Sequence, residues 1–182
     1  MRIPLALAAL LALALAACQS DAAPDRAPLA EAAGVEAGVQ PVAADLPADA
    51  PTLTVYKSPT CGCCTAWAEY MEREGFRVQT EDVTDLAAVK DSLGMPSDLS
   101  SCHTGVVSDG SSRYVVEGHV PAEHVRRLLA EGTDVRGLAV PGMPIGSPGM
   151  EQGDLRQPYD VLVVGPEGEA AVYDHVPGSG TP

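Results

Sequence analysis

Apolar and polar positions alternate in two stretches of the chain and recur at helical spacing between them. Residues 52–56 (TLTVY) are β-branched or apolar and predict a strand, and residues 76–83 alternate like a second strand. The segment between them, residues 63–74, has the spacing of a helix with one apolar face. The apolar residues on that face are Trp67, Tyr70 and Met71. A strand, a helix and a second strand in this order indicate a mixed α/β fold.

The remaining pattern predicts a thioredoxin-like domain. Further elements are expected at residues 84–93 (helix), 105–117 (irregular hairpin around an Asp-Gly turn), 121–131 (helix opened by proline), and 159–164 with 169–173 (final hairpin). A strand, a cysteine-bearing turn, a helix, a second strand and a closing hairpin match that fold, here with an inserted irregular hairpin and a long Pro/Gly loop. By analogy, we expect Pro158, just before the final hairpin, to face the cysteines.

The first 17 residues are interpreted as a secretory signal peptide. One cation, Arg2, precedes a Leu/Ala run that is too short to span a membrane and ends in Leu-Ala-Ala before Cys18. A cysteine directly after the cleavage site resembles a bacterial lipobox, so we expect Cys18 to carry lipid. An ordinary signal peptide with an incidental cysteine is the alternative. In a cell with two membranes, Gln19 in the second mature position favours the outer membrane.

Composition divides the mature chain into a tether and one domain. Residues 18–50 contain no aromatic residue and are rich in Ala, Pro, Asp and Glu, which predicts a disordered tether. Residues 51–178 are long enough for one domain with its own core, and residues 179–182 are expected to be a disordered tail. The formal net charge of −14 argues against nucleic acid or anionic lipid as partners. Membrane contact is therefore expected only through the lipid on Cys18.

Three cysteines, Cys61, Cys63 and Cys64, lie where the first strand gives way to the first helix. Thiols at a helix N-terminus experience the positive end of its dipole, which favours the thiolate, both a nucleophile and a soft metal ligand. Cys61 and Cys64 have the C-x-x-C spacing of a dithiol oxidoreductase, but that chemistry has no evident use for Cys63. Three thiols on one turn better match a soft metal, above all Cu(I), than zinc, whose closed sites draw on separated ligand pairs.

Further donor atoms come from later parts of the chain. Cys102 is a candidate fourth thiolate or the disulfide partner of a motif cysteine, with a small buried thiol as the alternative. His103 and His119 are candidate nitrogen ligands, or else loop histidines with hydrogen-bond partners of their own. His124, on a helix turn that looks exposed, and His175 are expected to be structural.

Three methionines offer thioethers, which Cu(I) also accepts. Met71 is on the first helix, and Met143 and Met150 lie in the Pro/Gly loop. Packing in the core, or beneath a lid, is the alternative for each.

Four motifs occur in order along the chain. They are Lys57 to Cys64 with Trp67, Ser101 to Thr104, Glu117 to Pro121, and Gly137 through Glu151. Together they resemble the CopG-like proteins, also catalogued as domain of unknown function 411, over nearly all of residues 53–175. The resemblance implies a periplasmic thioredoxin-like protein of copper resistance. Its implied copper ligands are Cys61, Cys63 and Cys64, followed in second rank by Cys102, His103 and His119. Family members often carry His-Met where this chain has Tyr70-Met71; if that histidine is a ligand in them, the site here has one nitrogen donor fewer.

We therefore predict a lipid-anchored periplasmic protein that holds Cu(I), and we expect several copper ions because adjacent thiolates readily bridge metals. Cu(I)/Cu(II) redox handling and delivery to an efflux or oxidase partner are further hypotheses. The rival is a thiol-disulfide oxidoreductase that uses Cys61 and Cys64, with Pro158 shaping its substrate groove. Cys63 discriminates between them, because only the thiolate cluster requires it. A structural disulfide domain, with all four domain cysteines oxidised, is a third and weaker hypothesis.

Overall fold

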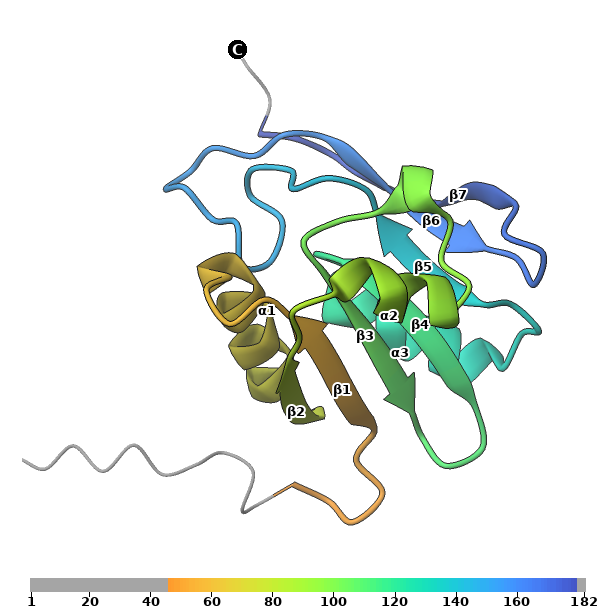
Figure 1. The fold of residues 1–182 in the computed structure, drawn as a ribbon. Helices are drawn as coiled ribbons and strands as arrows, with labels where there is room; N and C mark the ends of the chain where they lie inside the picture. Colours follow the sequence, from red (N-terminus) through yellow and green to blue (C-terminus); the bar gives the residue numbers. More distant parts are fainter. Residues whose placement is uncertain (1–45, 180–182) are drawn as a thin grey trace, which may run out of the picture. The chain divides into compact units, whose positions relative to one another are not determined.

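The structure is a computed structural model that describes residues 46–179. The predicted signal peptide and Cys18 lie outside these residues, as does most of the predicted tether. The described residues form one mixed seven-stranded sheet with the strand order β2-β1-β3-β4-β5-β6-β7 (Figure 1). No helix within residues 46–179 combines the length and apolar character needed to cross a membrane.

The elements follow one another closely from the first strand to the last. Their bounds are β1 Thr52–Lys57, α1 Gly62–Arg73, β2 Arg77–Asp82, α2 Leu86–Ser92, β3 His103–Ser108, β4 Arg113–Gly118, α3 Ala122–Glu131, β5 Gly137–Val140, β6 Tyr159–Val164 and β7 Ala170–Val176, with a short 3-10 turn, η2, at Ser97–Leu99.

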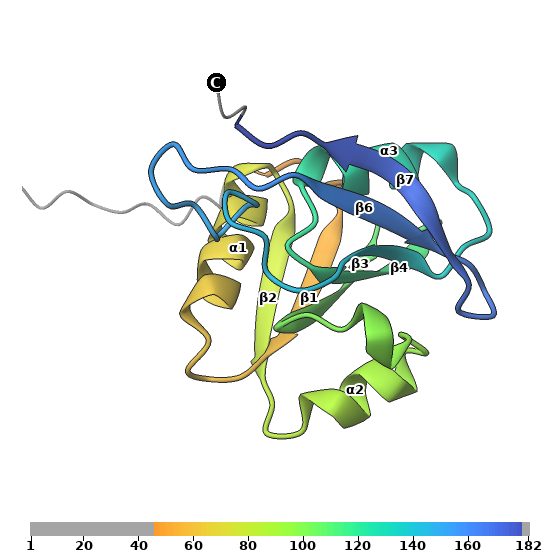
Figure 2. The ribbon, with the colours of Figure 1, turned by 90° about the horizontal axis from the view of Figure 1, so that it is seen from above.

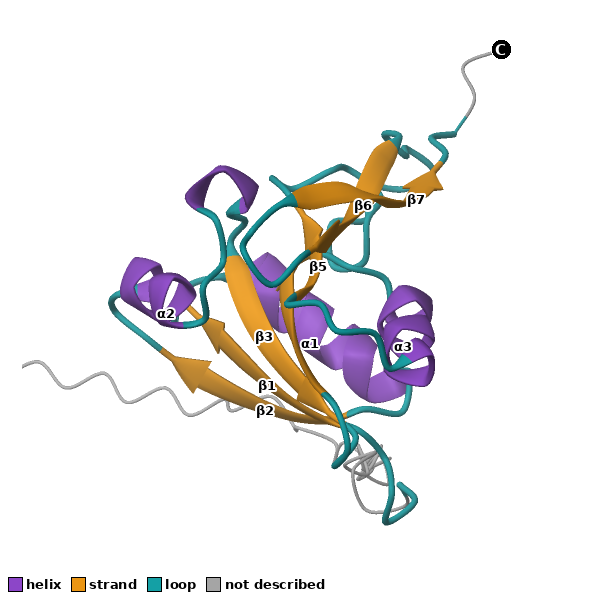
Figure 3. Cartoon of the chain, turned by 90° about the vertical axis from the view of Figure 1, so that its right-hand side faces the viewer, coloured by secondary structure: helices purple, strands orange, loops and turns teal. Residues whose placement is uncertain are grey.

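The first four strands and three helices form the thioredoxin-like part. Strand β1 pairs in parallel with β2 and antiparallel with β3, and β3 pairs antiparallel with β4. Helices α1 and α3 lie on one face of the sheet and α2 on the other (Figure 3). The main core is made by side chains of α1, α3 and the strands beneath them, and a smaller cluster around Met95 and Leu99 fills the α2 side. The predicted mixed α/β, thioredoxin-like fold is confirmed.

The β3–β4 and β6–β7 hairpins occupy positions in the sheet that differ from those expected. The hairpin that completes the thioredoxin-like part is β3–β4, whereas β6–β7 extends the sheet beyond β5. Strand β5, which pairs in parallel with β4, was not predicted, because its four buried residues show no alternation. Pro158 precedes β6, which is separated from β1 by three strands, so the expectation that it faces the cysteines is wrong. The residue that precedes β3 and faces them is Cys102.

Helix α1 forms because its buried residues repeat at the spacing of one helical face. Cys64, Trp67, Ala68 and Met71 are buried on this face, and Arg73 is the last helical residue. The indole N–H of Trp67 donates to the carbonyl of Val120 over 3.0 Å, so the largest core side chain has its polar atom satisfied. This bond ties α1 to the segment that enters α3.

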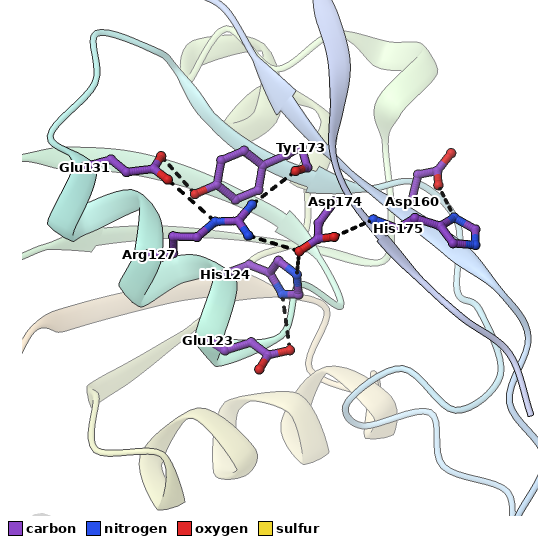
Figure 4. A network of polar contacts seen from close by, with 8 residues as sticks. All are labelled: Glu123, His124, Arg127, Glu131, Asp160, Tyr173, Asp174 and His175. Atoms are coloured by element: carbon purple, nitrogen blue, oxygen red, sulfur yellow. Dashed lines mark hydrogen bonds and ion pairs between the residues drawn. The ribbon is translucent and has the colours of Figure 1, made fainter.

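A polar network fastens the β6–β7 extension to α3 (Figure 4). The His124 Nε2 and Asp174 Oδ2 atoms are 3.1 Å apart, and the Arg127 guanidinium donates to the same carboxylate and stacks on the Tyr173 ring. The Tyr173 hydroxyl donates to Glu131. His124 is only 4 % exposed, so the expectation that its helix turn is exposed is wrong. The cause is the β6–β7 hairpin, which covers this face of α3.

Candidate metal centre

Four cysteine sulfurs meet at one end of the sheet. The Sγ atoms of Cys61 and Cys64 form a disulfide, and Cys63 and Cys102 are free thiols. The Cys63 sulfur lies 3.6 Å from that of Cys61 and 3.8 Å from that of Cys102. All four sulfurs lie within 4.8 Å of one another. The structure therefore joins the C-x-C-C motif to a cysteine nearly forty residues further along the chain.

The pairing of β1 with β3 explains this convergence. These strands are antiparallel, with Lys57 at the end of β1 opposite His103 at the start of β3. The turn that leaves β1 and the loop that enters β3 consequently meet at the same edge of the sheet. Cys61 caps the N-terminus of α1 in an extended conformation, which places the other two motif cysteines in the first helical turn. Cys64 is fully buried and its Sγ contacts the carbonyl oxygen of Cys102.

Two histidines extend the sulfur group. The Cys102 sulfur lies 3.3 Å from His103 Nδ1 and 3.0 Å from His119 Nε2. The other ring nitrogen of His119 is 2.8 Å from the carbonyl oxygen of Pro148, which only accepts hydrogen bonds. In the neutral ring this contact places the proton on Nδ1 and leaves the Nε2 lone pair directed at the thiol. A hydrogen bond from the far nitrogen is the usual way in which a protein orients a histidine ligand.

Burial keeps these groups neutral in the metal-free protein. Desolvation, the neighbouring His119 and the Lys90 ammonium lower the pKa of His103 well below its usual range. Desolvation also lowers the pKa of His119. For the thiol of Cys102, desolvation and the adjacent Cys63 raise the pKa to about 12. Both imidazoles thus have free lone pairs near neutral pH, whereas Cys102 retains a proton that a metal must displace.

The Pro/Gly loop between β5 and β6 covers the start of α1 (Figure 2). Gly149 has φ +81°, and a Cβ atom there would lie 2.8 Å from both the Cys63 carbonyl oxygen and the Trp67 backbone nitrogen. The carbonyl of neighbouring Pro148 faces His119. The loop is therefore packed on the cysteine turn, and glycine is required at position 149.

The methionines that the sequence offers as candidates differ in burial. Met71 is fully buried in the main core cluster. Met150, in the covering loop, is half-buried, and Met143 is 51 % exposed. The hydroxyl of Tyr70 accepts a hydrogen bond from the Ala122 N–H.

His124 of α3 pairs with the carboxylate of Asp174 in β7, whereas His175 pairs with that of Asp160 across the β6–β7 hairpin.

Sequence reasoning missed two charged residues behind the site. Lys90 and Glu117 are buried and form an ion pair that contacts the backbone on both sides of Cys102. A signal was present for Glu117, because it is the one charged residue in the otherwise apolar run from Tyr114 to Gly118. No pattern marks Lys90, which lies at a position of α2 where an exposed lysine is ordinary.

The fold and donor set define a thioredoxin-like protein with a thiol-rich candidate metal centre. Two solved structures match it, named copper resistance protein CopG, form 2 and form 1, with 44 % and 45 % sequence identity and TM-scores of 0.65 and 0.64. Each match covers 70 % of this chain, and 99 % and 98 % of the respective solved chains. The chain belongs to the family of that protein, which confirms the resemblance found in the sequence.

A family model, described as a protein of unknown function, DUF411, matches residues 99–150. This segment holds Cys102, His103, His119 and the first part of the covering loop. No curated protein matches the chain.

Proposed function

We propose that the protein binds Cu(I) through the thiolates of Cys61, Cys63, Cys64 and Cys102, with His103 and His119 as additional donors. The observation that carries this proposal is the approach of Cys102 to the C-x-C-C turn, because it assembles four sulfurs within 4.8 Å. The two similar solved structures belong to a copper resistance protein, which supports copper as the metal.

The chemistry of the donors fits a soft monovalent metal. Thiolates and neutral imidazoles suit Cu(I), and no carboxylate is part of either donor group found in residues 46–179. Opening the Cys61–Cys64 disulfide supplies two more thiolates beside Cys63 and Cys102. Four thiolates in one group favour bridging between metals, so we propose more than one copper ion per chain. Zinc is the less suitable metal, because three of the four sulfurs crowd one turn. Met71, packed in the core, is not included in the proposed ligand set.

A role in copper resistance follows from this proposal and from the names of the similar structures. We place the protein in the periplasm, anchored through lipid on Cys18 to the outer membrane. The net charge of −14 gives no reason to expect nucleic acid as a partner. A copper efflux or oxidase protein is the expected macromolecular partner. We also propose that the protein handles copper by redox chemistry. Oxidation of the Cys61–Cys64 dithiol to the disulfide would reduce two Cu(II) to two Cu(I) and release two protons.

The second candidate function is thiol-disulfide exchange by Cys61 and Cys64. It is favoured by the disulfide between these two residues at the start of α1, where thiol oxidoreductases carry theirs. Cys63 separates the two functions. Dithiol exchange does not need this residue, whereas a thiolate cluster loses the sulfur that lies between Cys61 and Cys102.

The test is copper binding by the reduced full-length chain under anaerobic conditions. The wild-type chain is expected to retain more than one Cu(I) and to protect the cysteines of residues 61–102 from alkylation, with Cys63→Ser losing most of both effects. Stoichiometric copper binding by a variant with Cys61, Cys63 and Cys64 all changed to serine would overturn the proposal. No bound copper, together with disulfide reductase activity that survives Cys63→Ser, would favour thiol exchange instead.

A further inference from the structure

A buried ion pair lies on the face of the sheet opposite the metal centre. Lys90 comes from α2 and Glu117 from β4, and their side chains are 7 % and 0 % exposed. A buried ion pair is a weak source of stability, because the loss of hydration offsets much of the attraction. The carboxylate is also incompletely satisfied, since its Oε2 atom has no hydrogen-bond partner among the described residues. The placement of this pair therefore calls for a reason other than stability.

The contacts of the pair supply that reason. Glu117 Oε1 accepts a 2.6 Å hydrogen bond from the backbone N–H of Ser101, as well as the bond from the Lys90 ammonium. Lys90 Nζ also donates to the carbonyl of His103 over 3.2 Å. Ser101 and His103 are the two neighbours of Cys102. One buried ion pair thus fixes the backbone on both sides of the cysteine that completes the sulfur group.

The end of β4 and the residue that follows it also contact the turn around Cys102. Glu117 holds Ser101 from the α2 side, and His119, two residues later, approaches the Cys102 sulfur to 3.0 Å. Gly118 between them has φ +70°, and a Cβ there would meet the Ser101 side chain at 2.6 Å. The turn around Cys102 is accordingly packed against three successive residues, the last two of β4 and the one that follows it.

We infer that Lys90 and Glu117 are positioning residues for the metal centre, a role that rests on the proposed copper function. They hold the Cys102 sulfur 3.8 Å from Cys63 and within reach of His119, although neither charged group is itself a ligand. Residues that orient ligands from outside a site commonly change metal affinity 10- to 100-fold, roughly, when they are replaced. Loss of the pair should therefore release Cys102 while the remainder of the fold stays intact.

The first experiment measures alkylation of the metal-free, disulfide-containing full-length chain. Its readout is the rate at Cys102 divided by the rate at Cys63, resolved by peptide mass spectrometry. Global unfolding accelerates both reactions, so this ratio reports only local release of Cys102. Glu117→Ala is expected to raise the ratio about tenfold or more. Glu117→Gln keeps an acceptor oxygen for Ser101 and is expected to stay within about threefold of the wild type.

Two further variants keep the test decisive. Leu128→Ala, which removes a fully buried side chain of α3, destabilises the fold and is expected to leave the ratio unchanged. Should Glu117→Ala fail to fold, Lys90→Met removes the other member of the pair and its hydrogen bond to the His103 carbonyl, and it is expected to raise the ratio about fivefold. An unchanged ratio in the folded variant, or a rise as large in Glu117→Gln or in Leu128→Ala, would overturn the assignment.

Cu(I) titration of the reduced full-length chains separates this inference from the proposed function. The wild type is expected to bind, and Glu117→Ala to bind about tenfold more weakly, with Leu128→Ala unchanged. Equal affinities of the wild type and Glu117→Ala would overturn the positioning role. A wild-type chain that binds no Cu(I) would overturn the proposed function, and the alkylation ratio would still decide whether the pair positions Cys102.

Discussion

Two regions of the molecule use a pair of histidines to join distant parts of the chain, and they use them in opposite ways. At the β6–β7 hairpin, His124 of α3 faces the carboxylate of Asp174 at 3.1 Å, and His175 faces that of Asp160 across the hairpin at 2.7 Å. In the candidate metal centre, His103 and His119 both face the sulfur of Cys102. The partner atom, oxygen or sulfur, is the main difference between the two regions.

This difference in partner changes what the imidazole can do. A histidine beside a carboxylate is part of a charged or hydrogen-bonded pair, and its contribution is to hold two elements together. Neutral, buried imidazoles beside thiols offer lone pairs to a soft metal, and the burial that lowers the pKa of His103 and His119 keeps them in that form. We therefore propose metal binding for the candidate metal centre and docking of the β6–β7 hairpin for the network around His124.

Replacement of Cys102 is the strongest way to test this division. Cys102 belongs to both donor groups of the centre, so Cys102→Ser removes the atom that joins the sulfurs to the histidines. Serine oxygen is a poor ligand for Cu(I), and the affinity is expected to fall about 100-fold, as measured by competition with a chromophoric chelator. His175→Gln, which removes an exposed imidazole, is the control and should bind as the wild type does. Equal losses of Cu(I) affinity in Cys102→Ser and His175→Gln would contradict the division between the two regions.

Substitution at Gly149 should open the centre without touching a ligand. The new Cβ of Gly149→Ala would lie 2.8 Å from two backbone atoms of α1, so the covering loop must move away. We expect about 1–3 kcal/mol of lost stability and a clear acceleration of Cys63 alkylation. Gly142→Ala is the matched control, because it also has a positive φ, +72°, in the same loop but open space around its Cβ. Faster alkylation in both variants would mean that backbone strain, and not contact with the cysteine turn, is responsible.

A matched pair of histidine variants separates the metal-binding role of one region from the structural role of the other. His119→Ala is expected to weaken Cu(I) binding about tenfold, because it removes a nitrogen next to the Cys102 sulfur. His124→Ala should instead reduce the free energy of unfolding by about 1–2 kcal/mol, through loss of a nearly buried side chain and its hydrogen bond, with Cu(I) affinity unchanged. Chemical denaturation and copper titration of both proteins provide the readouts, and an exchange of the two effects would refute the assignment.

The smallest expected effect is the pH dependence of stability in the metal-free protein. Because the pKa of His103 is lower in the folded than in the unfolded chain, the unfolded chain binds more protons as the pH falls below about 6.5. The free energy of unfolding should then fall with falling pH, by up to about 1.4 kcal/mol per pH unit for this one group. The measurement is a series of urea titrations between about pH 4.5 and 7. In His103→Gln, the free energy of unfolding is expected to depend less steeply on pH than in the wild type. An equally steep profile in this variant would mean that His103 is not held neutral.

The sequence predicted those parts of the fold that have a clear local pattern. The strand at residues 52–56 and the helix at 63–74 differ from β1 and α1 by at most one residue at each end, because one shows β-branched character and the other a 3.6-residue period. Strand β5 has neither signal, since all four of its residues are buried. The sequence contains two hairpins with similar turns, and the prediction assigned β6–β7 instead of β3–β4 to the thioredoxin-like part. The expected position of Pro158 was wrong for the same reason.

Only the part of the candidate site that has a local sequence pattern was predictable. The spacing of three cysteines on one turn indicates a site from the sequence alone. The short distance from Cys63 to Cys102, in contrast, depends on the pairing of β1 with β3. The roles of Lys90 and Glu117 depend on burial from the other face of the sheet, which no local pattern encodes. Cys18 lies outside the described residues, and lipidation there stays a prediction.

X-ray absorption at the copper edge shows whether the cysteine sulfurs hold the copper. The sample is the full-length chain, reduced, loaded with Cu(I) under anaerobic conditions and freed of unbound metal. We expect the edge of Cu(I), sulfur as the main nearest neighbour, and a copper–copper contribution from a bridged group. A nearest shell made only of nitrogen and oxygen, or a desalted protein without copper, would contradict it.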